Sequence, residues 1–344
     1  MKKILSTTFC LFFTLALQAQ TEKTVITLTD GSTVTYTSDQ YDKIVIINEL
    51  ETGVKVYLKN RKSKDYLATK IETTTEGGGD SDDSNNKNRN LMTAADAAQY
   101  PYAWRLEYPH LKRGNSIVSV HSTVDYGITY SVEWDCDKKS QRWSVYQFHN
   151  GIPDNNVGRT GSWKDDPNIP SAYQTHSSQY TGSGYSRGHM CMSNDRQSSD
   201  EQNGQTFYMS NAHPQNQNHN EGLWLTLETK VNNWGNSSSF RDTLYVVKAG
   251  TIDSSDKIKG YTSSGLLIPQ YFYMAILCLK NNKYKAIGFW TEHTTTKISN
   301  AKPADYAISI KELEERTGID FFCNLPDDIE EEVEASYTLS DWGL

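Results

Sequence analysis

The first part of the chain alternates apolar and polar residues in short runs, a pattern typical of strands with one buried face. Four runs show this alternation: Val25–Leu28, Val34–Tyr36, Lys43–Ile47 and Val54–Leu58. The first two flank Asp30-Gly31, a dipeptide typical of tight hairpin turns. We therefore expect a small all-β module over residues 21–75. The sequence leaves open whether this module binds a partner or a surface, or serves only as a spacer or folding adjunct.

Residues 76–90 interrupt this pattern. The segment has three consecutive glycines, Gly77-Gly78-Gly79, followed by acidic, Ser, Asn and basic residues, and it contains no apolar residue. Such a composition is typical of a solvated flexible linker, because it offers nothing to bury. We place a domain boundary here and expect a second domain over residues 91–344, which is long enough to form one large core.

Strand-like and helix-like segments mix in this second domain. The predicted strands are Ser131–His149, Thr206–Met209, Leu244–Ala249, Tyr271–Lys280 and Lys283–Trp290, the last two paired through an Asn281-Asn282 turn. The predicted helices are Asn220–Asn233, which follows a polar loop over Ala212–His219, and Ala304–Arg316, which ends near Gly318. The mixture predicts an α+β fold with a central, mostly antiparallel sheet.

The N-terminal residues have the features of a secretory signal peptide. Lys2 and Lys3 precede an apolar run, Ile4–Leu17, and a cleavage signal follows at Ala16-Leu17-Gln18-Ala19. The run is too short to span a bilayer as a permanent anchor, and no later segment is apolar for long enough. We expect residues 1–19 to be removed and the mature protein to be secreted or periplasmic.

Charge and cysteine content restrict the chemistry. The net charge is −8, and residues 91–344 hold 22 Lys and Arg against 30 Asp and Glu. This balance argues against a general attraction to polyanions and leaves room only for a local basic groove. Four cysteines follow the signal peptide, and their spacing favours none of the disulfide pairings: Cys136, Cys191, Cys278 and Cys323. No C-x-x-C pair exists, so a cysteine-ligated zinc site is not expected.

Two segments carry residue types suited to cutting a phosphodiester with one hard metal ion. The first is Arg187-Gly188-His189, which sets a titratable base beside a fixed positive charge. The second runs from Asn220 to Glu228 and offers an amide oxygen and a carboxylate eight positions apart. In a regular helix that spacing leaves them roughly 80° apart around the axis. The expected buried stripe of this helix is Leu223, Leu227, Val231 and Trp234.

Each of these residue types has a plain chemical use. A neutral His, with an ordinary pKa of ~6.5, can take a proton from water near neutral pH, and Arg187 can hold phosphate oxygens with its fork of donors. Mg²⁺ prefers oxygen ligands and keeps waters, so Asn220 alone can hold it when a substrate phosphate completes the shell. Glu228 is then placed to hold a metal-bound water. Each residue also has an ordinary structural role, such as a helix cap for Asn220, and only the combination favours a site.

These segments resemble the DNA/RNA non-specific endonuclease family of ββα-metal nucleases. The family pattern is Asp-Arg-Gly-His, then Asn-x-x-Pro-Gln, then Asn-x-Gly-x-Trp and Leu-Glu. The matching runs are Ser186-Arg187-Gly188-His189, Asn211-Ala212-His213-Pro214-Gln215, Asn220-Glu221-Gly222-Leu223-Trp224 and Leu227-Glu228. Further similarity covers roughly Tyr126–Glu334 and leaves the β module and the linker outside it.

The resemblance implies a ββα-metal nuclease fold and a role for each site residue. It makes His189 the general base, Asn220 the protein ligand of Mg²⁺, and Glu228 a carboxylate behind the metal. Another divalent cation such as Mn²⁺ could replace Mg²⁺. Arg187 and Asn211 would support the phosphate and the base.

Two positions depart from the family pattern. Ser186 replaces the motif's Asp, and we expect altered fine-tuning rather than loss of activity, because Ser can still hydrogen-bond locally. Arg159 is the candidate for an upstream phosphate-binding arginine, although its offset from Trp163 is slipped.

The expected activity is hydrolysis of DNA and RNA through the backbone with little sequence preference, since no zinc finger or recognition helix is evident. One alternative is a nuclease-fold protein that binds a surface or nucleic acid with weak or no catalysis, which Ser186 and the acidic balance favour. Another is a phosphodiesterase for a lipid or cyclic nucleotide, which no apolar pocket signal supports. The sequence leaves the oligomeric state open.

Overall fold

The computed structural model divides the chain into two compact units, Met1–Ser84 and Asn85–Leu344, each with its own core. The described residues are 22–28, 32–38, 40–48, 53–59, 63–75, 86–90, 93, 96, 99, 100, 102–150, 152 and 155–344. The expected signal peptide, residues 1–19, lies outside them. Over the part of the chain that is described, no helix is long and apolar enough to cross a membrane.

The first unit contains a five-stranded antiparallel sheet in the order β2-β1-β5-β4-β3. Its strands are β1 (Glu22–Leu28), β2 (Thr33–Thr37), β3 (Tyr41–Asn48), β4 (Gly53–Leu58) and β5 (Ser63–Thr75). Its core contains Ile26, Tyr36, Tyr41 and Val56. The four strands expected from alternation are present. A fifth strand, β5, pairs with both β1 and β4 and was not expected, because it is mostly polar and has no regular alternation.

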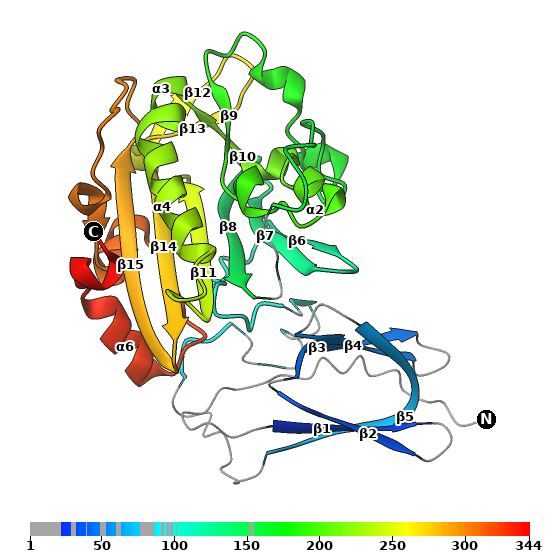
Figure 1. Ribbon diagram of the computed structural model, residues 1–344. Coiled ribbons are helices and arrows are strands. Elements are labelled where there is room, and N and C mark those ends of the chain that lie inside the picture. The colour runs from blue at the N-terminus through cyan, green and yellow to red at the C-terminus, as the bar shows by residue number, and fades with distance from the viewer. Residues whose placement is uncertain are drawn as a thin grey trace. The chain divides into compact units, whose positions relative to one another are not determined.

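The second unit is built on a seven-stranded sheet in the order β16-β15-β14-β11-β8-β7-β6, and each neighbouring pair is antiparallel (Figure 1). The strands are β6 (Ser116–Thr123), β7 (Gly127–Asp135), β8 (Ser140–His149), β11 (Thr243–Gly250), β14 (Tyr271–Lys280), β15 (Lys283–Glu292) and β16 (Ala307–Ile308). This confirms the expected α+β class with a central antiparallel sheet.

Both faces of this sheet are covered, which is why its central strands are apolar on both sides. One core includes α4 (Leu225–Gly235), and the other includes α5 (Ile310–Thr317) and α6 (Asp327–Ala335). The stripe expected on the site helix is buried in the first core: Leu223, Leu227, Val231 and Trp234. The four described cysteines are buried free thiols: Cys136, Cys191, Cys278 and Cys323.

Ser131–His149 is not one strand but parts of β7 and β8, because a turn over residues 136–139 reverses the chain. The Asn281-Asn282 turn between β14 and β15 is confirmed. Both asparagines have positive φ, 49° and 59°, as the favoured two-residue hairpin turn requires.

The helix expected over Ala304–Arg316 is shorter than predicted. It begins at Ile310, because the Ser309 side chain caps it by accepting a hydrogen bond from the Glu312 backbone. The residues before Ser309 form a short 3-10 helix and β16 instead. The helix ends as expected at Gly318, whose φ of 72° suits glycine.

The described part of the expected linker belongs to the second unit. Asn88 Nδ2 donates to Glu330 Oε1 at 3.0 Å, and the buried Asn90 accepts at Oδ1 from the Leu111 backbone at 2.8 Å. Amide side chains therefore fasten residues 86–90 to the second unit, although they contribute no apolar surface. The boundary between the units falls after Ser84 rather than after Asn90.

Candidate active site

His189 lies at the end of strand β9 (Ser186–His189), which pairs antiparallel with β10 (Ala212–Gln215). The register sets His189 opposite Ala212 and Arg187 opposite Pro214. Because side chains alternate along a strand, Arg187 and His189 project from the same face. The predicted pairing of a base with a fixed positive charge is therefore preserved in the fold.

The prediction of a strand at Thr206–Met209 was wrong. Tyr208 makes only an isolated bridge with Lys164, and Met209–Asn211 form a short 3-10 helix. The strand lies instead in the first half of the segment expected to be a polar loop. Pro214 is typical of loops, but a proline is also accepted at the edge of a two-stranded sheet, because one missing donor can face outward there.

Asn220 lies inside a helix rather than at its start. The helix begins with α3 (Gln217–His219), whose cap is Asn216: its side chain accepts from the Asn218 backbone at 3.0 Å. It continues as a π-helical turn, Asn220–Trp224, and then as α4. The cap role considered for Asn220 therefore belongs to Asn216, and the helix extends further at both ends than the expected Asn220–Asn233.

The π-helical turn changes the geometry expected for Asn220 and Glu228. Such a turn holds one more residue than a regular turn. The eight positions between the two residues therefore count as about seven in a regular helix, which brings them within roughly 20° of one line along the axis. This is closer than the roughly 80° of a regular helix. The amide and the carboxylate thus lie on one side of the helix, two turns apart.

The ring of His189 packs among aromatic side chains. Its centroid lies 4.4 Å from that of Trp163 and 5.0 Å from that of Phe207. The residue is half-buried, but its Nε2 is inaccessible to solvent and has no hydrogen-bond partner among the described residues. Burial, together with the charges of Arg159 and Lys248, lowers the pKa of His189 to about 3. The imidazole is therefore neutral across the physiological pH range.

Glu228 is buried beside a lysine that the sequence analysis did not select. Lys248, in β11, is fully buried, and its Nζ lies 3.3 Å from Glu228 Oε1 and 3.7 Å from Asp195 Oδ2. Burial raises the pKa of Glu228 to about 7, and Lys248 opposes that rise. Lys248 contacts Glu228, and its charge also acts on His189. The sequence did contain a signal for this buried lysine, because Lys248 lies within the apolar run of β11.

The two candidate arginines lie on the His189 side of the site. Arg187 Nη2 donates to the Ser177 carbonyl at 2.7 Å, and its guanidinium lies 5.2 Å from the centroid of the Tyr180 ring. A backbone carbonyl therefore holds Arg187 where Ser186 offers no carboxylate. Arg159 is exposed and lies 4.8 Å from the centroid of the Phe207 ring. Its charge acts on His189, so the slipped offset does not remove Arg159 from the site.

Asn211 lies behind the backbone that follows His189. It is fully buried, and its Nδ2 donates to the carbonyls of Cys191 and Thr206 at 2.8 Å. Its Oδ1 accepts from the Cys191 backbone at 2.8 Å and from Ser144 Oγ at 3.2 Å. Asn211 therefore fixes the backbone just after His189 rather than facing a substrate.

Gln215 is a further residue of the site that was not selected, although it ends the Asn-x-x-Pro-Gln motif. Its Nε2 lies 2.8 Å from His219 Nδ1, which ties β10 to the start of the helix. Its Oε1 is buried and has no partner among the described residues. The side chain packs so closely on Gly188 that a Cβ there would overlap it. Gly188 is thus required by a close approach between the two strands.

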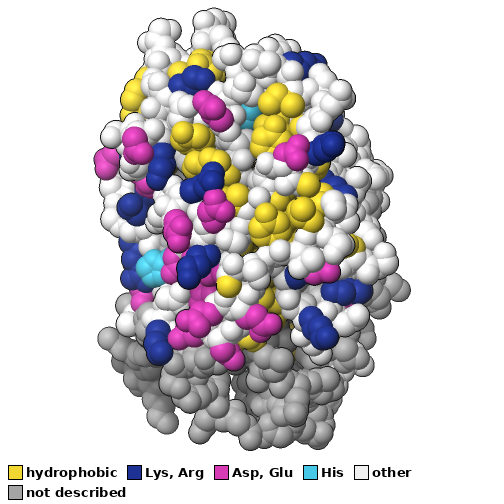
Figure 2. All heavy atoms as spheres, turned by 90° about the vertical axis from the view of Figure 1, so that its left-hand side faces the viewer, with side chains coloured by type: hydrophobic (Ala, Val, Ile, Leu, Met, Phe, Trp, Pro, Cys, Tyr) yellow, Lys and Arg dark blue, Asp and Glu magenta, His cyan; other side chains and the backbone are white. Residues whose placement is uncertain are grey.

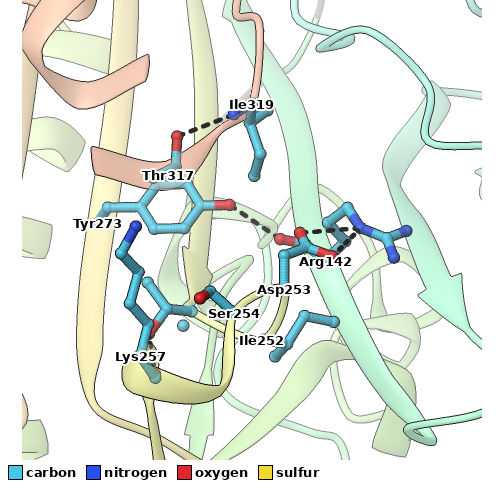
Figure 3. A pocket seen from close by; sticks show the side chains of 10 residues that line it. Arg142, Ile252, Asp253, Ser254, Lys257, Tyr273, Thr317 and Ile319 are labelled. Carbon is cyan, nitrogen blue, oxygen red and sulfur yellow. Dashed lines mark hydrogen bonds and ion pairs between the residues drawn. The ribbon is translucent and has the colours of Figure 1, made fainter. Parts of the chain in front are cut away.

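A small hollow lies elsewhere in the second unit (Figure 3). The residues around it include Arg142 and Asp253, an ion pair at 3.0 Å, and Tyr273, whose hydroxyl donates to the Arg142 carbonyl at 2.9 Å. None of the predicted site residues lines this pocket. The candidate active site is therefore defined by its side chains and not by this hollow.

The donor atoms of the candidate site suit a hard metal ion. Asn220 contributes an amide oxygen from a half-buried position, and the cap role that would occupy its side chain belongs to Asn216. In the described ranges no three His, Cys, Asp or Glu side chains are grouped so as to hold a metal. These residues fit an ion that takes one protein oxygen and otherwise waters and phosphate, as Mg²⁺ does.

The antiparallel pair of β9 and β10 followed by the helix that carries Asn220 is the ββα arrangement of a metal nuclease. The chain belongs to the DNA/RNA non-specific endonuclease family, whose model matches residues 111–328. The mitochondrial nuclease EXOG of Danio rerio is 29% identical over 169 residues, covering 46% of this chain and 49% of that protein. The human EXOG is 26% identical over 207 residues, covering 57% and 56%.

The match to a bacterial relative covers more of that relative's length than the matches to EXOG do. A nuclease of Nostoc sp. is 26% identical over 214 residues, which cover 60% of this chain and 75% of that protein. In contrast, the chain spans only about half the length of the EXOG proteins that it matches. A crystal structure of an EndoG/EndoGI complex has a similar fold, with a TM-score of 0.52 and 20% identity over 68% of this chain and 94% of that one. Its likeness supports the ββα-metal nuclease fold.

Proposed function

We propose that the protein is an exported, Mg²⁺-dependent endonuclease that hydrolyses phosphodiester bonds in DNA and RNA with little sequence preference. One observation carries the proposal: a neutral, half-buried His189 shares a strand face with Arg187, and Lys248, whose charge acts on His189, pairs with Glu228 on the helix of Asn220. Family membership and the nuclease relatives support the same reaction class.

The side chains divide the chemistry among them. His189 accepts the proton of the attacking water, since its ring is neutral and half-buried. Arg187 and the exposed Arg159 bind phosphate oxygens from the same side. Asn220 would hold Mg²⁺, or Mn²⁺ in its place, which supplies positive charge at the phosphate and an acidic water for the leaving oxygen. Glu228, two helical turns away, orients such a water.

Recognition in this proposal is through the sugar-phosphate backbone. The groups assigned to substrate are arginines and a metal site, which position a strand but do not read base edges. Basic and acidic side chains are intermixed on the face shown in Figure 2. With a net charge of −8, attraction to the substrate has to be local to the site. Because few cationic groups contact phosphate, we expect cleavage to fall less steeply with salt than for a basic nuclease.

Export is proposed from the leader alone: Lys2, Lys3 and the apolar run that ends before Ala19. The β module of the first unit is not assigned a role in the chemistry, because the family match lies wholly in the second unit.

A cleavage assay tests the proposed activity. The protein without residues 1–19 is incubated with supercoiled plasmid and with folded RNA, in Mg²⁺ or in EDTA. Nicking and then smearing of both substrates, abolished by EDTA, is the expected result. Binding without cleavage at any Mg²⁺ or Mn²⁺ concentration would instead favour the second candidate, a nucleic-acid-binding protein on a nuclease fold, which Ser186 and the acidic balance support.

A further inference from the structure

The imidazole of His189 packs against two aromatic rings. A catalytic histidine is commonly held by a hydrogen bond from one ring nitrogen to a carboxylate or a carbonyl. Over the described residues, His189 has no such bond: its Nε2 is buried without a partner, and burial and two cations alone account for its lowered pKa. The rings of Trp163 and Phe207 occupy the surrounding space.

These two rings contact His189 in different ways. Trp163 lies against the imidazole at 4.4 Å with an interplanar angle of 43°, and Phe207 meets it edge to face at 5.0 Å and 89°. The two aromatic rings also contact each other at 5.4 Å. Contacts of this kind have preferred geometries, so together they restrict the tilt and rotation of the imidazole.

The backbone that carries the two aromatic rings is itself fixed. The Lys164 backbone donates to the Phe207 carbonyl at 3.1 Å, and the Met209 backbone donates to the Lys164 carbonyl at 2.9 Å. Phe207 is buried and packs directly on Gly161, where a Cβ would overlap its ring. The segment of Trp163 and the segment of Phe207 are thus joined as one unit next to β9.

A buried polar cluster anchors the segment of Trp163 to the central sheet. Asp166 is buried and its Oδ2 lies 3.0 Å from Nε2 of the buried His121 on β6, and it accepts a hydrogen bond from Ser210 Oγ. Its Oδ1 accepts from the Asn168 backbone at 2.8 Å. This cluster, three residues beyond Trp163, ties the aromatic contact to the sheet and to the turn before β10.

We propose that Trp163 and Phe207 are positioning residues that orient the imidazole of His189 for proton transfer, in place of a hydrogen-bonded partner. This inference rests on the proposed function for its kinetic consequence, but the ring contact itself does not depend on activity. Neither residue touches the reacting atoms. Their effect is on how often the ring nitrogen faces the attacking water.

The test compares Trp163→Leu with Trp163→Phe and with a matched control, Trp290→Leu. Trp290 stacks on Tyr271 at 4.7 Å and packs against the core on the opposite side of the sheet. The first readout is the NMR signal of the imidazole Cε1–H group of His189, assigned by its loss in His189→Ala. The second is plasmid cleavage, with kcat and KM measured separately and thermal unfolding as the check on the fold.

In the unmodified protein the ring current of Trp163 should shift the His189 signal from the position of a free imidazole. Trp163→Leu should remove most of this shift and lower kcat about 10- to 100-fold, the scale of a small misplacement, with KM within about twofold. Trp163→Phe should restore much of the His189 shift and much of kcat. If Trp163→Leu fails to fold, Trp163→Phe is compared with the unmodified protein instead. Trp290→Leu should leave the signal and kcat unchanged.

Three results would overturn the inference: an unmoved His189 signal in Trp163→Leu, an unchanged kcat, or a rise in KM alone, which would make Trp163 a substrate contact. If the unmodified protein cleaves neither DNA nor RNA, the proposed function fails instead. The NMR shift would still decide whether Trp163 holds the ring.

Discussion

Lys248 is the cation between two buried carboxylates, and its replacement by methionine is a sharp perturbation of the site. Methionine keeps an unbranched, flexible side chain but removes the charge. Asp195 retains hydrogen bonds from Tyr146 Oη at 2.6 Å and Asn232 Nδ2 at 2.8 Å. Glu228 loses the ammonium that lies 3.3 Å from its Oε1. The consequence for stability should therefore depend on whether Glu228 is ionised.

The magnitude follows from the pKa of Glu228. Burial raises it from 4.5 to about 7 in the presence of Lys248, and the fully buried site needs no correction for solvent screening. At about 1.4 kcal/mol per pH unit, this shift corresponds to roughly 3 kcal/mol of stability that is present below pH 4.5 and lost as the pH rises through 7. Lys248→Met raises this pKa further, so its cost should be roughly 3–5 kcal/mol at pH 8. At pH 5.5 Glu228 is protonated in both proteins, and the cost should be clearly smaller.

Urea unfolding at pH 5.5 and pH 8, followed by tryptophan fluorescence, measures the difference. All 8 tryptophans belong to the second unit, so the signal reports the unit that contains Lys248. Lys280→Met is the matched control, because Lys280 pairs with Asp242 at 2.9 Å on the surface and should cost less than about 1 kcal/mol at either pH. An equal loss for Lys248→Met at both pH values would show that Lys248 acts through packing and not through the charge of Glu228.

Three further predictions follow from the site and the unit boundary. Asn220→Ala should raise the Mg²⁺ concentration needed for half-maximal plasmid cleavage with the fold retained; an unchanged Mg²⁺ titration would place the metal elsewhere. A protein starting at Asn85 should fold and keep most of its cleavage rate, whereas one starting at Leu91 should unfold at a lower temperature, and equal melting temperatures would refute the role of residues 86–90. Gly188→Ala should lower both activity and melting temperature, because its Cβ overlaps Gln215, while Gly204→Ala, where nothing lies within 4 Å, serves as control.

Much of the fold was predictable because its signals are local. The β14–β15 hairpin could be read from two apolar runs around Asn281-Asn282, and the buried stripe of α4 from its spacing. Strand β10 could not be predicted, because Pro214 and its amide neighbours have the composition of a loop. Its pairing partner, β9, lies more than 20 residues earlier in the chain. Strand pairing at that separation depends on tertiary contacts that local composition does not encode.

The candidate site was likewise predictable only in part from the sequence. His189, Arg187 and Asn220 belong to a short motif, so their approximate placement could be expected from the sequence. The π-helical turn at Asn220 and the burial of Lys248 beside Glu228 could not be predicted. The second depends on how the helix packs against β11, which local composition does not encode. Asn211 shows the reverse case: the motif identifies the residue, but only its four hydrogen bonds show that it supports the backbone after His189.

The most direct test of the account is the plasmid cleavage rate of His189→Ala at pH 8 in saturating Mg²⁺, measured beside its affinity for the same DNA. The account predicts a rate lower by ~10²–10⁴, the usual contribution of a positioned proton acceptor. Salt-sensitive DNA binding should be retained, because Arg187, Arg159 and the metal site remain. A rate close to that of the unmodified protein would contradict the assignment of His189 as the base.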